Sequence, residues 1–239
     1  MLWLLVPLGF LAGSVPFGFL LGKAKGIDIR EHGSGNIGST NVFRILGKKA
    51  GIFCLILDAL KGFIPVLLAI NLCRIEGTNP LMGIGFLSNL NDPLEGSQQF
   101  LGQSIQVLTA LATILGHNYS PWIGFKGGKG IATTGGALIA LMPAAVVILI
   151  LVFIIVTKIT KYVSVGSIAT GIALPIITGL GSYYHIQKGD IPPGGWNKPL
   201  FIFSLVAGIL AIWKHRTNIA RLRAGTEHRI GQKKTPPAS

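Results

Sequence analysis

The hydrophobic residues of this chain fall in long runs that polar residues seldom interrupt. Residues 137–156, for example, are all apolar and include one proline, Pro143. Apolar runs of about 20 residues are typical of transmembrane helices. The pattern predicts seven such helices, over residues 2–21, 51–72, 100–116, 130–141, 144–157, 163–180 and 200–213. We therefore predict an all-α, polytopic membrane protein in which residues 1–239 form a single domain.

The fourth and fifth predicted helices are short, because a bilayer core of about 30 Å calls for roughly 20 residues. One kinked helix over residues 130–157, bent at Pro143, is the alternative and would leave six spans. The basic residues favour seven. With seven spans, 17 of the 21 Lys and Arg residues lie on one side of the membrane, 3 lie on the other and Lys61 lies within a span. Basic loops stay in the cytoplasm, so we expect the N-terminus outside and the C-terminus in the cytoplasm.

Composition supports the membrane assignment. Charged residues make up 12% of the chain, whereas soluble domains carry about 25%. The net charge of +13 reflects basic loops beside anionic membrane surfaces, and no basic domain outside the membrane points to nucleic acid.

No small-residue cleavage site follows the first apolar segment, so we expect it to be retained. Cys54 and Cys73 lie roughly 28 Å apart along one helix, too far to bridge, and are predicted to be buried packing residues.

Polar residues gather in three blocks, residues 32–49, 116–130 and 214–229, all on the predicted cytoplasmic side. The second block leads into the sequence GFKGGKGIATTGG, residues 124–136. Glycines let backbone N–H groups approach an oxyanion, and a helix N-terminus adds unpaired N–H groups. Lys126 and Lys129 add full charges, so this block predicts a phosphate site. It is not a Walker A loop, because Gly130 follows Lys129 where that motif has Ser or Thr.

The first block, HGSGNIGSTNVFRILGKK, combines small polar side chains with one arginine. A planar guanidinium binds phosphate oxygens in a bidentate way. This predicts anion binding by Arg44 together with its polar neighbours Ser34, Asn36, Thr40 and Asn41. A re-entrant turn whose polar groups satisfy one another is the alternative.

The third block, KHRTNIARLRAGTEHR, continues the last predicted helix into the cytoplasm. His215 and Asn218 are three residues apart and share one helix face, so we expect both to contact substrate. His117, in the second block, suits a base or phosphate-binding group and a helix-end anchor equally well. Five basic side chains of the third block and the tail are expected to contact lipid headgroups: Arg221, Arg223, Arg229, Lys233 and Lys234.

Two further pairs of residues are candidates for an ion pair and for a histidine–acid motif. Asp58 and Lys61 lie within the second predicted helix and are expected to pair, because a buried charge is costly. That pair either lines the site or contacts substrate. His185 and Asp190 match the H-x-x-x-x-D pattern of soluble and peripheral glycerolipid acyltransferases. They fall in a loop on the outer side, away from the phosphate-binding blocks, so we exclude them from the predicted site.

Three segments, GSGNIGSTNVFR, GHNYSPWIGFKGGKGIAT and HRTNIARLRAGTEHR, resemble the three motifs of the bacterial acyl-phosphate:glycerol-3-phosphate acyltransferase family, PlsY. The segment DALKGFIP also matches. The resemblance implies a seven-helix enzyme of the bacterial inner (plasma) membrane whose site faces the cytoplasm. Such an enzyme transfers a fatty acyl group from acyl phosphate to the 1-hydroxyl of glycerol 3-phosphate. The products are lysophosphatidic acid and phosphate, in the first acylation step of phospholipid synthesis.

The resemblance also assigns roles. It implies catalytic contacts to glycerol 3-phosphate by Ser34, Arg44, Lys129, His215 and Asn218. The expected substrate-binding residues are Asn36, Thr40, Asn41, Lys126, Gly127, Gly128, Gly130 and His117. No metal and no cofactor are expected. The expected partners are the two substrates and the lipid bilayer, with no nucleic acid and no obligate protein partner. A transporter of an organic phosphate is the alternative, but the chain shows no internal repeat.

Overall fold

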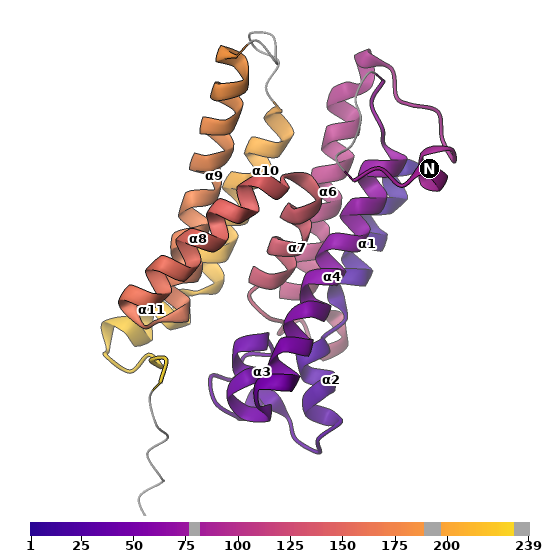
Figure 1. Cartoon of the computed structure of the whole chain (residues 1–239). Helices are drawn as coiled ribbons and strands as arrows, with labels where there is room; N and C mark the ends of the chain where they lie inside the picture. The colour runs from indigo at the N-terminus through magenta and orange to yellow at the C-terminus, as the bar shows by residue number, and fades with distance from the viewer. Residues whose placement is uncertain (77–81, 189–196, 232–239) are drawn as a thin grey trace, which may run out of the picture.

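The computed structural model describes residues 1–76, 82–188 and 197–231, and its regular elements are helices (Figure 1). The long helices are α4 (Lys48–Leu72), α6 (Gln99–Asn118), α8 (Pro143–Thr160), α9 (Val163–Gln187) and α10 (Lys198–Lys214). The shorter helices are α1 (Leu5–Ser14), α2 (Phe17–Lys23), α3 (Ser39–Leu46), α5 (Gly85–Ser88), α7 (Ile131–Leu141) and α11 (Arg216–Arg223). Short 3₁₀ turns cover Leu2–Leu4, Ile29–Glu31, Gly96–Gln98 and Pro121–Ile123.

The apolar segments predicted from the sequence all form helices. Five helical stretches among the described residues are long and apolar enough to cross a membrane, and α10 with α11 makes a sixth, bent by 49°. Helix α7 is apolar but has only 11 residues. The prediction of an all-α membrane protein is therefore confirmed.

The first apolar segment differs from its prediction as one continuous helix. The chain breaks between α1 and α2, where Val15 takes φ −59° and ψ 117°. Pro16 causes this break, because it has no N–H for an intrahelical hydrogen bond and its ring disfavours helical geometry in the residue before it. A side chain from another element satisfies the buried backbone at this break: Ser120 Oγ donates to the Ser14 carbonyl at 2.6 Å.

The alternative of one kinked helix over residues 130–157 is wrong. Met142, between α7 and α8, has φ −152° and ψ 67°, which lies outside the helical region. Pro143 then occupies the first position of α8, where its missing N–H costs nothing. Helix α7 packs against α4, whereas α8 runs along α9 (Figure 1).

The helices form two groups that meet through one core and spread apart toward the end that carries α3 and α11 (Figure 1). Core residues such as Val66, Val107, Ala137, Leu174 and Phe203 join α4, α6, α7, α9 and α10. In the group that contains α1, α4, α6 and α7, helices α4 and α7 touch backbone to backbone (Figure 1). A Cβ atom on Gly62 would lie 2.0 Å from the Thr133 carbonyl oxygen, and one on Gly136 would lie 1.9 Å from that of Ala59. Small residues at such crossings are typical of membrane helices.

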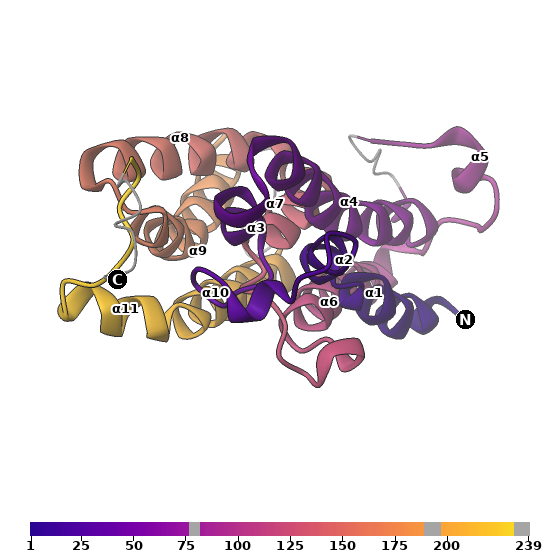
Figure 2. The same cartoon turned by 90° about the horizontal axis from the view of Figure 1, so that it is seen from below.

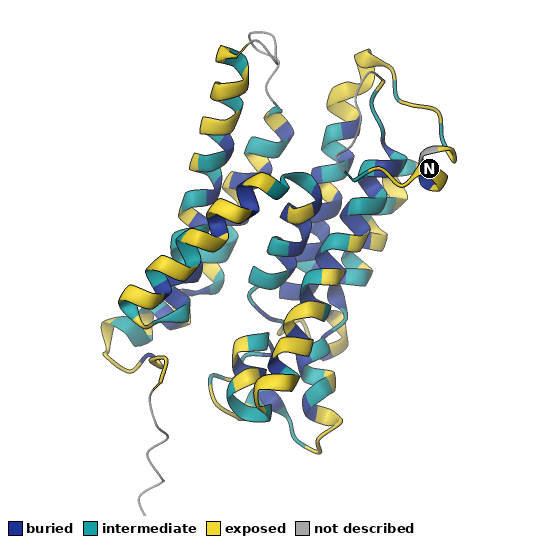
Figure 3. Ribbon diagram, in the orientation of Figure 1, coloured by how far each residue is buried: buried dark blue, intermediate teal, exposed yellow. Residues whose placement is uncertain are grey.

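The outer faces of α8 and α9 are exposed and apolar (Figure 3). They carry large hydrophobic side chains, among them Ile148, Leu151, Ile155, Ile172, Ile176 and Leu180. A soluble monomer seldom exposes so large an apolar surface. These faces suit contact with lipid. Cys54 and Cys73 are free and buried, as predicted.

Candidate functional site

The first polar block forms a loop that leads into α3, and Asn41 organises it. Asn41 is 1% exposed. Its amide nitrogen donates to the carbonyls of Ile29 and His32, at 3.2 and 2.9 Å. Its oxygen accepts from Ser34 N at 2.9 Å and from an Arg44 guanidinium nitrogen at 3.4 Å. Asn41, expected to bind substrate, therefore has its hydrogen-bonding capacity filled within the loop, and it orients Arg44.

The rest of this block is fitted closely around Asn41. Gly33 has φ +62°, and a Cβ atom there would lie 2.4 Å from the Asn41 side-chain oxygen, so the position requires glycine. Asn36 Oδ1 accepts from Gly38 N at 2.8 Å and so supports the turn before α3. Ser34 is half-buried and Thr40 is exposed. The block is thus self-supporting, as in the alternative interpretation, while Arg44 and Ser34 project from it.

The second block wraps around the end of α6, and His117 lies beneath its glycines. His117 is 4% exposed. Gly128 N donates to the His117 carbonyl at 3.0 Å. A Cβ atom on Gly128 would lie 2.0 Å from His117 Nε2, and one on Gly127 would lie 2.0 Å from the His117 carbonyl oxygen. This geometry favours the anchoring role for His117. Lys126 is exposed, and Gly130, with φ +80°, caps the start of α7.

Lys129 connects the second block to the third. Its ammonium donates to Asn218 Oδ1 across 89 positions of sequence. Asn218 is 5% exposed and belongs to α11. Lys214, at the end of α10, donates to the Asn118 carbonyl at 3.0 Å and holds the same two blocks together.

His215 lies at the bend between α10 and α11 and is 3% exposed. Its Nδ1 lies 2.7 Å from the Ala211 carbonyl oxygen. Because a carbonyl oxygen only accepts, Nδ1 carries the hydrogen in this contact. In the neutral ring, Nε2 then keeps its lone pair, which suits a hydrogen-bond acceptor or base.

Glu227 is a site residue that the sequence analysis did not single out. Its Oε1 accepts from Asn218 Nδ2 at 2.6 Å and from Ser164 Oγ at 2.8 Å. Its Oε2 accepts from Arg221 Nε at 2.7 Å. Burial alone would raise the pKa of the Glu227 carboxyl, but these three hydrogen bonds outweigh burial and lower the pKa below its usual range. Glu227 thus orients the Asn218 amide so that its oxygen faces Lys129.

Arg221 pairs with Glu227 and so belongs to this cluster, which the sequence analysis did not predict. Its expected contact with lipid headgroups stays a prediction. Arg229 lies over the Tyr162 ring, 5.4 Å from its centroid. Lys233 and Lys234 lie outside the described residues. The one signal for this arrangement was a single carboxylate, Glu227, within a basic tail.

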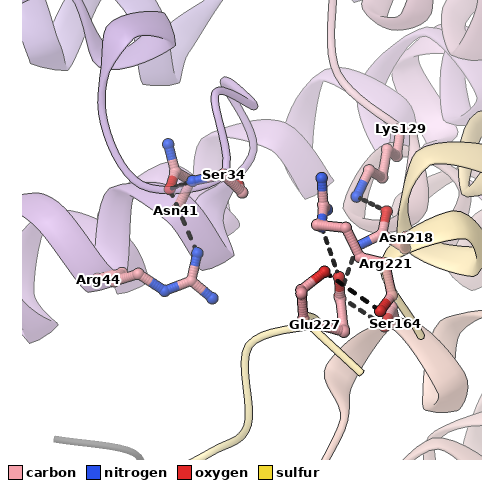
Figure 4. Close-up of polar contacts among 9 residues, drawn as sticks. Ser34, Asn41, Arg44, Lys129, Ser164, Asn218, Arg221 and Glu227 are labelled. Atoms are coloured by element: carbon pink, nitrogen blue, oxygen red, sulfur yellow. Dashed lines mark hydrogen bonds and ion pairs between the residues drawn. The ribbon is translucent and has the colours of Figure 1, made fainter. Parts of the chain in front are cut away.

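The three blocks meet at one end of the helices. Figure 4 shows Ser34 and Arg44 on one side and Lys129, Asn218 and Arg221 on the other, with the Arg44 guanidinium directed toward Glu227. Seen from below, α3 lies between α11 and the group formed by α1, α4 and α6 (Figure 2). Residues that are far apart in the sequence thus surround one small region.

The charges of this region affect one another. Burial lowers the pKa of Lys129 to about 8, with contributions from Arg221, Arg44 and Lys214 that Glu227 partly opposes. Burial also lowers the pKa of Arg44, and Glu227 opposes this shift. Several cations share one carboxylate, so the site has an excess of positive charge. An anion such as a phosphate would relieve it.

The residues that we excluded or kept separate lie elsewhere. His185 is exposed near the far end of α9, and Asp190 lies outside the described residues. Asp58 and Lys61 form the predicted ion pair, with 2.9 Å between Lys61 Nζ and Asp58 Oδ1. Both side chains are almost fully buried.

Comparisons with known proteins identify the family of this chain. The sequence model of the family described as glycerol-3-phosphate acyltransferase matches residues 3–225. A glycerol-3-phosphate acyltransferase of Desulforamulus reducens is 42% identical over 228 residues, which cover 95% of this chain and 94% of that protein. One from Geobacter sulfurreducens is 37% identical over 228 residues, which cover 95% of this chain and 96% of that protein.

Two solved structures are also similar. The chain therefore belongs to the glycerol-3-phosphate acyltransferase family, whose activity is that of a membrane acyltransferase. The similar structures are of PlsY, described as an integral membrane glycerol 3-phosphate acyltransferase. Its glycerol 3-phosphate form has a TM-score of 0.75 and 35% identity, covering 96% of each chain. Its lysophosphatidic acid form has a TM-score of 0.73 and 34% identity, covering 96% of this chain and 95% of that one. The family predicted from the three motifs is confirmed.

Replacing Glu227 with Gln tests its influence on Asn218 and Lys129. The variant keeps the shape but puts an NH₂ group against a donor, Arg221 or Asn218. A hydrogen bond to a charged group is worth about 1.5–3 kcal/mol, so we expect kcat to fall by roughly 10- to 100-fold. Steady-state kinetics in detergent measure this. Thr226→Val, an exposed change one residue away, is the control. An unchanged kcat for Glu227→Gln would contradict the role.

Proposed function

We propose that this chain transfers a fatty acyl group from acyl phosphate to the 1-hydroxyl of glycerol 3-phosphate, giving lysophosphatidic acid and inorganic phosphate. The observation that carries the proposal is the excess of cations around Lys129 and Arg44. Both substrates bear phosphate, and both would need N–H donors and positive charge. Membership of the family supports glycerol 3-phosphate as the acceptor.

The site residues divide into two sets in this proposal. Arg44, Lys129 and Asn218, with Ser34, bind the phosphate of glycerol 3-phosphate and fix its orientation. The glycine-rich loop before α7 binds the phosphate of the acyl donor through backbone N–H groups, with help from Asn36 and Thr40. Holding both reactants side by side supplies much of the rate enhancement, because it removes the entropy cost of their encounter.

The chemistry needs no acyl-enzyme. The acceptor hydroxyl attacks the carbonyl carbon of the mixed anhydride, and a C–O ester bond forms. The C–O bond to phosphate breaks, and phosphate leaves with its electron pair. The hydroxyl proton passes to a phosphate oxygen of the substrate or to His215 Nε2. Lys129 and the N–H donors stabilise the negative charge that develops on the carbonyl oxygen and the departing phosphate.

We also propose seven membrane spans, with the N-terminus outside and this site at the cytoplasmic face of the bacterial plasma membrane. The distribution of Lys and Arg supports this orientation. The separation of α7 from α8 supports counting them as two short spans. The acyl chain then stays among the helices while glycerol 3-phosphate enters from the cytosol.

The test supplies purified protein in detergent with glycerol 3-phosphate and one of three donors: acyl phosphate, an acyl-carrier thioester or acyl coenzyme A. We expect phosphate release and lysophosphatidic acid formation with acyl phosphate alone. Product formation only from a thioester would replace the proposed donor and keep the acceptor. Failure with all three donors would count against the whole proposal.

The pKa of Lys129 predicts a pH dependence. Lys129 is protonated below about pH 8 and neutral above it, and only the protonated form attracts phosphate. We expect KM for glycerol 3-phosphate to rise as the pH is raised past 8, with the midpoint moved upward because bound phosphate favours the ammonium. KM measured from pH 7 to about 10 checks this, since lysine ordinarily titrates near 10.4. In Lys129→Arg, which stays charged, the rise should be absent.

A further inference from the structure

The buried ion pair between Asp58 and Lys61 lies on α4, inside the helix group, and the site described above does not include it. Their side chains are 3% and 4% exposed. Two charges this deep in a membrane helix are expensive and are seldom retained for stability alone. Their contacts explain what they do.

Lys61 holds the break in the first span. Its ammonium donates to the Val15 carbonyl at 2.7 Å, at the point where Pro16 interrupts the helix. It also lies 5.5 Å from the centroid of the Phe17 ring, in the first turn of α2. Helix α2 in turn presses on the first polar block, because a Cβ atom on Gly18 would lie 1.8 Å from the Ile37 carbonyl oxygen. Lys61 therefore fixes the helix that supports the loop before Arg44.

Asp58 lies near the second polar block rather than the first. The same oxygen that pairs with Lys61 lies 3.7 Å from His117 Nδ1. His117 supports the glycine-rich loop through the hydrogen bond from Gly128 N and through direct contact beneath Gly128. The Asp58 carboxylate therefore lies next to the side chain under the second block, at a distance longer than a hydrogen bond. Because the pair is buried and its ammonium is already engaged by a carboxylate, a carbonyl and an aromatic ring, direct contact with substrate does not explain it.

We infer that Asp58 and Lys61 are positioning residues that hold the Arg44 loop and the glycine-rich loop in register with each other. The inference rests on the proposed function, since it assigns these two loops to the two phosphate-bearing substrates. One rigid pair, on one helix, touches the support of each loop. The distance between the two bound substrates then depends on the pair, although neither side chain touches a substrate.

The test removes the pair without leaving a lone buried charge. In Asp58→Leu/Lys61→Met, apolar side chains of similar size replace both charges, a change that often preserves or raises stability. We expect a melting temperature close to that of the wild type and a thermal shift with glycerol 3-phosphate that persists. We expect kcat to fall roughly 100-fold, the loss typical of a misplacement of about 1 Å. The control is Thr178→Val/Ser204→Ala, which removes a buried polar contact of 2.8 Å between α9 and α10.

The outcomes separate the inference from the proposed function. A wild type that is inactive with all three donors would refute the proposed function. A wild type that is active, beside a folded variant whose kcat is within twofold of it, would overturn the inference. If the first variant does not fold, Asp58→Asn/Lys61→Met takes its place with the same criterion. Failure of both to fold would also overturn the inference, because the pair would then serve folding rather than positioning. A loss of kcat equal to that of the control would do the same.

Discussion

Replacement of Lys129 with alanine is expected to lower kcat/KM by roughly 10³-fold, equivalent to about 4 kcal/mol of transition-state stabilisation. Lys129 is the cation that joins the glycine-rich loop to Asn218, and burial strengthens its attraction for phosphate. Alanine removes the charge and leaves the Asn218 oxygen without its partner. Initial rates of phosphate release at varied substrate concentrations give the loss.

The control is His185→Ala, at an exposed position near the far end of α9. We expect its kcat/KM to match that of the wild type. If instead the His185 variant were inactive and the Lys129 variant active, the H-x-x-x-x-D pattern would be the site and the assignment made above would be reversed.

The second large effect is expected from Arg44→Ala, which should lower kcat/KM by about 10²- to 10³-fold, mainly through KM for glycerol 3-phosphate. Arg44 is the cation that the first block contributes, and Asn41 orients its guanidinium. Arg44→Lys keeps the charge but loses the planar fork, so it should fall between the alanine variant and the wild type. Substrate saturation curves for the three proteins separate charge from geometry.

Arg223→Ala provides a matched loss of positive charge, because Arg223 is an exposed cation at the end of α11. Exposed substitutions usually change stability by no more than about 0.5 kcal/mol, so we expect the variant to fold and its kcat/KM to stay close to that of the wild type. Equal losses in the Arg44 and Arg223 variants would indicate a general effect of charge at the membrane surface.

The helices were predictable because each is an apolar run, and lipid leaves a chain few ways to satisfy its backbone other than helix. Even the separation of residues 130–157 into α7 and α8 followed from counting basic residues in the loops. The three blocks were predictable as polar segments as well, since glycines, cations and small polar residues gather there between the apolar runs.

Distant contacts were not predictable from local pattern. Pro16 is visible in the sequence, and a break in the helix there is predictable. The donors to the carbonyl groups at that break are Lys61 and Ser120, which lie 46 and 106 positions from their partners. The sequence did not predict that some polar side chains of the three blocks support the loops rather than bind a ligand. Asn41 and His117 look like ligands in the sequence, yet both side chains are buried, where Asn41 bonds within the Arg44 loop and His117 lies beneath the glycine-rich loop.

Glu227 lies beyond the last apolar helix and two residues past the end of the family match. Ile230 N, three positions on, donates to the Lys161 carbonyl at 2.9 Å, so this short segment crosses back to the turn between α8 and α9. A shortened protein that stopped at Gly225 would keep every hydrophobic helix and every cation of the site, and would insert and purify as a membrane protein. It would nevertheless lack the Glu227 carboxylate that orients the Asn218 amide. The smallest unit to express for activity measurements thus extends at least to Ile230, well past the boundary that hydropathy suggests.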